Sequence, residues 1–185
     1  MEQSEVQLIE ATNPIGKIQL GLDDITRKSL KTKIKLDSVG YDRSTKTKYR
    51  TDLQMQYRDN NFEHLSDKVA NIISGYAKEK LYTSNCWGII YNQNEESKPH
   101  IHPNSVWSWI YYIDCCENCS PLVFTKRNTE VKPNIDQLIL FNGADDLNEH
   151  AVFPQKCEHE RVIVAGNLKY VDGAPRSSDR LSFYK

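Results

Sequence analysis

The second half of the chain alternates short apolar runs with turn residues. Runs rich in β-branched and aromatic residues span 85–92, 106–113, 121–125, 136–141, 150–153 and 161–167. Glycine, asparagine and proline separate these runs, as turn residues separate short strands. The pattern predicts six short strands that form a β-sandwich or jelly roll.

The first half of the chain predicts two helices packed outside these strands. Residues 22–34 open with two aspartates, which favour a helix N-terminus, and carry apolar residues among lysines at Ile25, Leu30 and Ile34. In residues 62–81 the apolar side chains recur with the period of a helix. The predicted stripe is Phe62, Leu65, Val69, Ile72, Ile73, Tyr76 and Leu81. Residues 36–58 are polar and predict a loop or an edge hairpin.

The chain length predicts one domain, since domains commonly have roughly 100–200 residues. We expect the 185 residues to divide into a helical and mixed part (1–81), a β-core (82–170) and a polar tail (171–185). No run approaches the roughly 18 apolar residues that a membrane span requires. The acidic start has no apolar stretch, which argues against a secretory signal, and five cysteines then indicate reduced thiols in the cytoplasm.

The charges are nearly balanced over the whole chain but unevenly distributed. The 24 Lys and Arg against 25 Asp and Glu leave a net charge of −1. Residues 27–50 contain nine Lys and Arg and two Asp, so this segment carries +7 and the remainder −8. With tyrosines at 41 and 49 the segment could contact nucleic acid, and a solvated helix face with a loop is the more common explanation.

Three of the five histidines fall where strand ends can converge. His100 and His102 form a His-x-His pair, and on a strand such residues share one face. His150 begins a later predicted strand. Three imidazoles on one face of an ion leave positions open for substrate and dioxygen, as in non-haem iron oxygenases. A surface His-x-His pair without a metal is the alternative.

Arg161 opens the apolar run of residues 161–167. An arginine that leads into a buried strand requires an anionic partner, because an unpaired buried charge is costly. Its planar guanidinium suits a carboxylate. A structural Asp or Glu and a bound ligand are both open as the partner.

Several motifs together resemble the Fe(II)/2-oxoglutarate-dependent oxygenases. They are YNQNEESKPHIHP from Tyr91, WIYYID from Trp109, and DQLILFNGADDLNEH ending at His150, followed by an arginine eleven residues later. The resemblance is to the prolyl 4-hydroxylase-like branch and to the small oxygenases of phage and bacterial genomes. It implies a double-stranded β-helix, the cupin-like jelly roll, with the N-terminal helices outside.

The resemblance also implies roles for individual residues. His100 and His150 correspond to iron-binding histidines, and Arg161 corresponds to the residue that binds the distal carboxylate of 2-oxoglutarate. Tyr91 and Tyr112 correspond to tyrosines that line the co-substrate pocket. The implied cofactor is Fe(II), and the implied reaction hydroxylates a substrate while 2-oxoglutarate yields succinate and CO2. The substrate could be a protein side chain, a nucleic acid or a small metabolite.

One position departs from the family pattern. Where the family usually has Asp or Glu two residues after the first histidine, this chain has His102, which we expect to be the third metal ligand. A neutral imidazole in place of a carboxylate leaves the iron with one more positive charge. Two alternatives follow: a three-histidine cupin-type dioxygenase that does not use 2-oxoglutarate, and an inactive jelly-roll binding or virion protein.

The cysteines and tryptophans have simpler interpretations. Cys115, Cys116 and Cys119 form a CCENC motif that could bind zinc with Cys157 and His159, although free thiols or a disulfide fit as well. Trp107 and Trp109 share one face of a predicted strand, and we expect them to pack against the helices.

Overall fold

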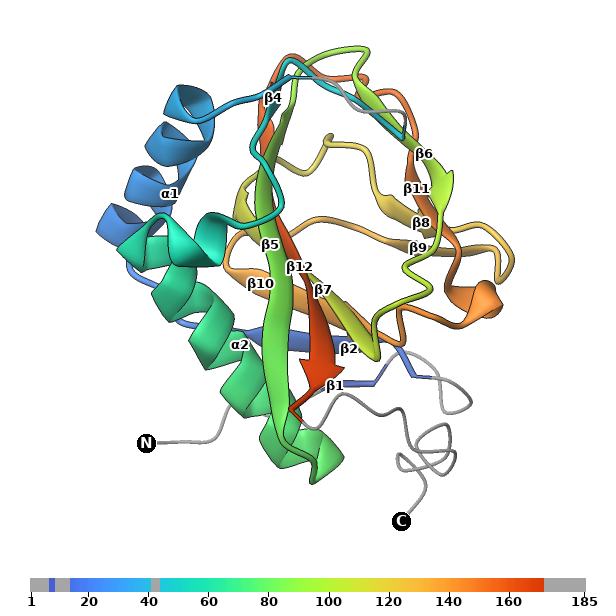
Figure 1. The fold of residues 1–185 in the computed structure, drawn as a ribbon. Helices are drawn as coiled ribbons and strands as arrows, with labels where there is room; N and C mark the ends of the chain where they lie inside the picture. The colour runs from blue at the N-terminus through green and yellow to red at the C-terminus, as the bar shows by residue number, and fades with distance from the viewer. Residues whose placement is uncertain (1–6, 9–13, 41–43, 172–185) are drawn as a thin grey trace.

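The strands form two antiparallel sheets that face each other, with both helices on the outer face of the larger sheet (Figure 1). The computed structural model describes residues 7–8, 14–40 and 44–171. The seven-stranded sheet has the order β1 (Gln7–Leu8), β2 (Gly16–Gln19), β10 (Gln137–Phe141), β7 (Trp107–Asp114), β12 (Arg161–Tyr170), β5 (Leu81–Tyr91) and β4 (Tyr49–Arg50). The five-stranded sheet has the order β3 (Thr45–Lys46), β6 (Glu96–His100), β11 (His150–Val152), β8 (Leu122–Phe124) and β9 (Thr129–Val131).

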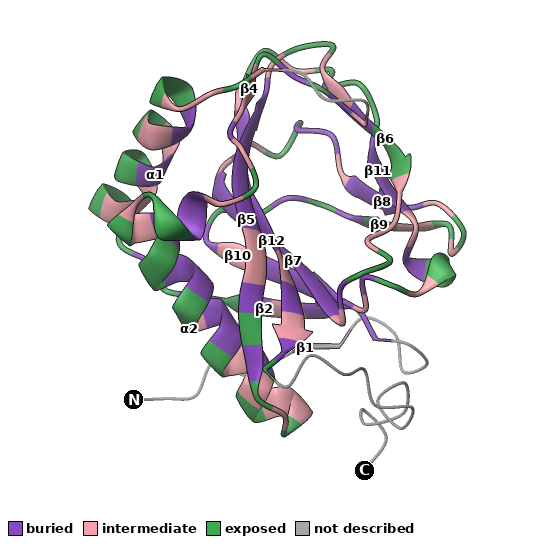
Figure 2. Ribbon diagram, viewed as in Figure 1, coloured by how far each residue is buried: buried purple, intermediate pink, exposed green. Residues whose placement is uncertain are grey.

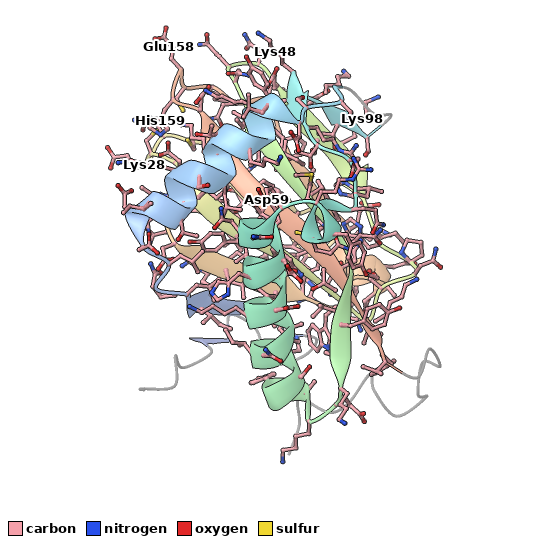
Figure 3. All side chains as sticks on the ribbon, turned by 60° about the vertical axis from the view of Figure 1, so that its left-hand side comes forward. Lys28, Lys48, Asp59, Lys98, Glu158 and His159 are labelled. Atoms are coloured by element: carbon pink, nitrogen blue, oxygen red, sulfur yellow. The ribbon has the colours of Figure 1, made fainter. Side chains whose placement is uncertain are left out.

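The two predicted helices are confirmed, with corrections at their ends. Helix α1 (Asp24–Leu36) is capped by Asp23, whose carboxylate accepts the Thr26 N–H at 2.8 Å, and α2 (Asn60–Ala77) is capped by Asp59 (Figure 3). Helix α2 ends earlier than predicted because Lys78 adopts a left-handed conformation, so Leu81 begins β5 instead. Among the apolar residues of α1, Leu30 and Ile34 are buried, whereas Ile25 is 81% exposed.

Most residues of β7, β10 and β12 in the large sheet are buried (Figure 2). Because successive strand residues point to opposite faces, one set of side chains packs under the helices and the other between the sheets. Tyr111, Val162 and Val164 belong to the helix-side core, whereas Tyr112 and Ile163 belong to the core between the sheets. This double burial explains the nearly continuous apolar sequence of β12. Trp107 and Trp109 lie in the helix-side core, as predicted.

The predicted edge hairpin within residues 36–58 is wrong. Strands β3 and β4 do not pair with each other; β3 pairs with β6 and β4 pairs with β5, so they belong to different sheets. A short 3-10 helix, η1 (Met55–Tyr57), follows β4. Such pairings depend on residues distant in the chain, which local patterns do not reveal. Residues 41–43 and 172–185, including most of the predicted tail, lie outside the described residues.

The basic segment 27–50 is largely paired with acids of the same chain. Six of its nine cations form ion pairs with carboxylates: Arg27, Lys28, Lys31, Lys33, Lys35 and Lys46. These pairs favour the interpretation as a solvated helix face, because paired cations are less available to phosphates. None of the described helices is long and apolar enough to cross a membrane.

Candidate metal centre

Three histidines converge at the open end of the smaller sheet. Strand β6 ends at His100 and β11 begins at His150, and these residues lie directly opposite each other in the antiparallel pair. Their ring centroids are 4.4 Å apart, and the ring of His102 lies 5.1 Å from His100 and 5.2 Å from His150. One ring nitrogen of each lies within 4.8 Å of the others. The predicted convergence of these three residues is therefore present.

His102 reaches the cluster from a loop and not from a strand as predicted. Its backbone N–H donates to the carbonyl of Gly143 at 2.9 Å, and its own carbonyl accepts the Ser105 hydroxyl at 2.7 Å. A Cβ at residue 143 would overlap the hydroxyls of Ser105 and Ser108. Gly143, which the sequence marks only as a turn residue, thus allows two loops to approach closely and places His102.

Backbone carbonyls orient two of the three imidazoles. Nδ1 of His100 lies 2.7 Å from the carbonyl oxygen of Lys98, and Nδ1 of His150 lies 3.0 Å from that of Asn148. A carbonyl oxygen only accepts, so both Nδ1 atoms carry the proton, and the Nε2 atoms carry the lone pair that can bind a metal. This is how metal-binding histidines are commonly held.

Burial favours the neutral form of the His102 and His150 imidazoles. Loss of solvent, followed by the nearby His100, lowers the pKa of His102 to about 3. The same causes hold the pKa of His150 well below its ordinary value. Neutral imidazole is the form that binds a metal. Among the described residues, no carboxylate joins the cluster. Glu149 instead accepts the Thr125 hydroxyl at 2.6 Å, and Asp145 caps the short 3-10 helix η2 (Asp146–Asn148).

Arg161 is fully buried between the two sheets and lies against two tyrosines. Its Cζ is 5.0 Å from the ring centre of Tyr91 and 5.2 Å from that of Tyr112, and Nη2 donates to the Tyr112 hydroxyl at 3.2 Å. Burial raises the pKa of both tyrosines, more than the nearby guanidinium lowers it. Both hydroxyls therefore keep their protons and can donate to an anion.

The guanidinium of Arg161 lacks an anionic partner in the described part of the chain. Its Nε and Nη1 are buried and have no hydrogen-bond partner there. The neighbouring acids are used elsewhere: Asp114 binds Lys31 and His159, and Glu160 binds Lys31 and Lys35. An unpaired buried cation is unfavourable. These N–H donors remain available to the oxygens of a bound carboxylate.

A cavity of about 280 Å³ adjoins the histidines and is enclosed by strands of both sheets. Its walls include all three histidines, Tyr91, Ser97 and several apolar side chains. The hydroxyl oxygens of Tyr91 and Ser97 are 2.8 Å apart. Ser97 carries no signal in the sequence. Arg161 does not itself line the cavity, so a ligand reaches the guanidinium only past wall residues such as Tyr91.

Comparison with known proteins points to one family. Residues 85–132 match the model of a family described as "Putative 2OG-Fe(II) oxygenase". This stretch includes His100, His102, Tyr91 and Tyr112, and ends before His150 and Arg161. No curated protein matches the chain in sequence.

Solved structures resemble the protein over most of its length. A viral collagen prolyl hydroxylase from Paramecium Bursaria Chlorella virus-1, in complex with 2OG, has a TM-score of 0.65 at 17% identity and covers 85% of this chain and 96% of its own. A prolyl-4-hydroxylase from Pseudomonas putida has a TM-score of 0.66 at 12% identity, covering 86% and 94%. HygX from Streptomyces hygroscopicus, with nickel and 2-oxoglutarate bound, has a TM-score of 0.65 at 10% identity, covering 86% and 84%.

These comparisons confirm the predicted fold and the predicted resemblance. The mainly β architecture with two packed antiparallel sheets and external helices is the jelly roll of the 2-oxoglutarate oxygenases. In the sequence of residues 85–132, and in fold over most of the chain, the protein resembles the Fe(II)/2-oxoglutarate-dependent oxygenases, including the prolyl 4-hydroxylase-like enzymes.

Proposed function

We propose that the protein is a non-haem Fe(II)- and 2-oxoglutarate-dependent dioxygenase that hydroxylates its substrate, with release of succinate and CO2. The observation that carries this proposal is the buried guanidinium of Arg161, which lacks a protein carboxylate within the same sandwich that gathers three imidazoles. A dicarboxylate co-substrate supplies what each group lacks. One carboxylate end would balance the buried cation, and the other end would bind the metal held by the histidines.

His100, His102 and His150 would hold the iron, and bound iron supplies the activation of dioxygen. Three protein ligands leave the remaining coordination positions to small molecules. Since all three ligands are neutral, the ion keeps its full double positive charge. An anionic chelator such as the keto acid end of 2-oxoglutarate is therefore favoured by electrostatics as well as by geometry.

The residues around Arg161 bind and orient the co-substrate. Arg161 pairs with the distal carboxylate, and the hydroxyls of Tyr112 and Tyr91 donate to it or position the guanidinium. The apolar walls, which include Ile89, Ile110 and Ile163, exclude water and strengthen these electrostatic contacts. The similar structures of the viral prolyl hydroxylase and HygX contain 2OG or 2-oxoglutarate, in agreement with this assignment.

Calorimetric titration of the anaerobic, iron-loaded protein with 2-oxoglutarate tests the proposal. We expect Arg161→Met to weaken binding by more than about 30-fold, because removal of one partner of a buried charge pair costs roughly 2–5 kcal/mol. The same change should preserve or raise the stability of the unliganded protein, since it removes an unpaired buried charge. A purely structural role for Arg161 predicts the opposite change in stability.

Matched variants separate the two halves of the site. Arg58, whose side chain is 60% exposed, provides the control Arg58→Gln, which should bind 2-oxoglutarate normally. His150→Ala should lose iron, whereas exposed His64→Ala should retain it. Unchanged 2-oxoglutarate affinity in Arg161→Met would sink the proposal. Iron binding without any affinity for 2-oxoglutarate would favour the three-histidine dioxygenase instead, and absence of both would favour a binding protein.

A further inference from the structure

A second group of metal-binding side chains lies apart from the histidines. Cys116 and Cys119 belong to the loop between β7 and β8, and Cys157 belongs to the loop between β11 and β12. Their sulfur atoms form a nearly equilateral triangle, with Sγ–Sγ distances of 3.6 Å (Cys116–Cys119), 3.7 Å (Cys116–Cys157) and 3.7 Å (Cys119–Cys157). All five cysteines of the chain are free thiols.

The triangle has the dimensions of one face of a zinc–thiolate tetrahedron. A Zn–S bond of about 2.3 Å with tetrahedral angles places neighbouring sulfurs about 3.8 Å apart. A disulfide requires about 2.05 Å and joins only two sulfurs, which leaves the third without a role. Thiolates are soft ligands that select zinc over the harder ions that carboxylates prefer.

Hydrogen-bond donors already point at two of the sulfurs. The backbone N–H of Cys116 donates to Sγ of Cys119 at 3.3 Å, and Nε2 of Gln155 donates to Sγ of Cys157 at 3.0 Å. Gln155 is fully buried, and its Oε1 accepts the N–H of Ser120 at 2.8 Å. Donors to sulfur stabilise the thiolate that a metal requires, and such supporting contacts are typical of ligands held for a metal.

We propose that Cys116, Cys119 and Cys157 form a zinc site, separate from the histidine centre, with the fourth position open to solvent. Two of the three thiols are only half-buried, so water can complete the tetrahedron. Cys115 lies outside the group. His159, which is labelled in Figure 3, is close in sequence to Cys157, but its Nε2 contacts the Asp114 carboxylate at 3.0 Å. The zinc joins the two loops that adjoin the end of β7 and the start of β12, where Arg161 lies.

Zinc content in a background without the histidine centre tests this site. The double variant His100→Ala/His150→Ala, reconstituted with zinc and freed of loose metal by gel filtration, should retain one zinc per chain by mass spectrometry. Adding Cys119→Ser or Cys157→Ser should abolish that zinc. Adding Cys115→Ser, the matched control, should leave it in place.

Titration of the intact double-histidine variant with Co(II) gives a readout that does not depend on the folding of serine variants. A thiolate-to-cobalt charge-transfer absorption that disappears on addition of zinc is the expected result. Absence of this absorption, zinc retained in both serine variants, or a Cys116–Cys157 or Cys119–Cys157 disulfide in protein alkylated during isolation would each overturn the proposal. The zinc should also persist in Arg161→Met, so this test does not depend on 2-oxoglutarate binding.

Discussion

Adjacent tyrosines on β7 serve different cores because a strand turns each successive side chain to the opposite face. The Tyr111 hydroxyl donates to Asp136 at 2.7 Å on the helix side of the sheet. The Tyr112 hydroxyl accepts from Arg161 at 3.2 Å in the core between the sheets. Both side chains are fully buried and both contact a charged group. This pair allows a structural contribution to be distinguished from a contribution to ligand binding.

Tyr112→Phe and Tyr111→Phe should both destabilise the protein, by about 1.5–3 kcal/mol, since each loses a buried hydrogen bond to a charged group. Only Tyr112→Phe should also weaken 2-oxoglutarate binding, because it frees the guanidinium to shift. Chemical denaturation measures the first effect, and calorimetry the second. Equal 2-oxoglutarate affinities in the two variants would show that Tyr112 does not position Arg161.

The sequence predicts some of these residue positions well and others poorly. His100, His150, Tyr91, Tyr112 and Arg161 lie at or near strand ends, so the strand pattern predicts their positions. Their roles stay predictions that rest on the family resemblance. The His-x-His motif also identifies His102. The backbone contact of His102 with Gly143 in another loop, however, cannot be predicted from any periodicity in the sequence. The cluster of Cys116, Cys119 and Cys157 forms because two loops about 40 residues apart in sequence meet in the fold. The CCENC motif alone could therefore not show which three of the five candidate zinc ligands lie together.

At the scale of elements, α1 rests on β5 where the strand has no side chain. A Cβ at Gly88 would overlap Cγ1 and Cδ1 of Ile34, which is fully buried. The close approach of helix and sheet thus requires glycine at this position. Ile34 in turn covers the strand backbone that glycine exposes.

Gly88→Ala should destabilise the protein by about 1–3 kcal/mol, the usual cost of forcing extra volume into a packed core. Ile34→Ala alone should cost roughly 2–5 kcal/mol. The double variant should lose clearly less stability than the sum of the two single variants. Ile34→Ala leaves space for the new methyl group, and this methyl group partly fills the cavity that Ile34→Ala creates. Thermal and denaturant unfolding measure the cycle. Gly75→Ala in α2, where the added methyl meets nothing, is the control and should be neutral or stabilising.

The apolar elements are predictable from sequence, and the short polar ones are not. Both helices and most of the six predicted strands have enough residues to show a period, whereas β8 and β11, with three residues each, are recognised by their apolar character. Strand β6 (Glu96–His100) is polar and contains a proline, and β3, β4 and β9 have only two or three residues each. These strands exist because a partner strand supplies their hydrogen bonds. A pattern read along the chain therefore misses them.

At the scale of the whole molecule, lysines of α1 join the helix to the ends of two central strands. Lys31 contacts Asp114 at 2.7 Å and Glu160 at 2.9 Å, and Lys35 contacts Glu160 at 2.8 Å. Burial alone would raise the pKa of both acids, but hydrogen bonds from the lysines, and from His159 to Asp114, outweigh it and lower each pKa. The ionised acids therefore stabilise the fold.

Because these pKa values are lower in the folded state, their stabilisation is fully present above the ordinary carboxyl pKa of about 4. It is lost as the pH falls through the lower folded values. Lys31→Met should cost about 1 kcal/mol at neutral pH and should make the loss of stability between about pH 5 and pH 3 smaller than in the wild type. Denaturant unfolding across this range measures the effect. Lys28→Met, which breaks only an exposed pair with Asp24, should change the acid profile less than Lys31→Met does.

Strand β12 lies inside the large sheet, between β7 and β5, and follows all of that sheet's other strands in sequence. It pairs with β5 over ten residues and with β7 over seven. Until β12 inserts, β5 and β7 each present a long apolar edge without a partner, and the sheet remains two separate ribbons. The large sheet is therefore completed only when its last strand pairs. We expect this dependence to make folding slow and to leave intermediates prone to intermolecular strand pairing. The step that joins the ribbons also delivers Arg161, so completion of the core and of the ligand site is a single event.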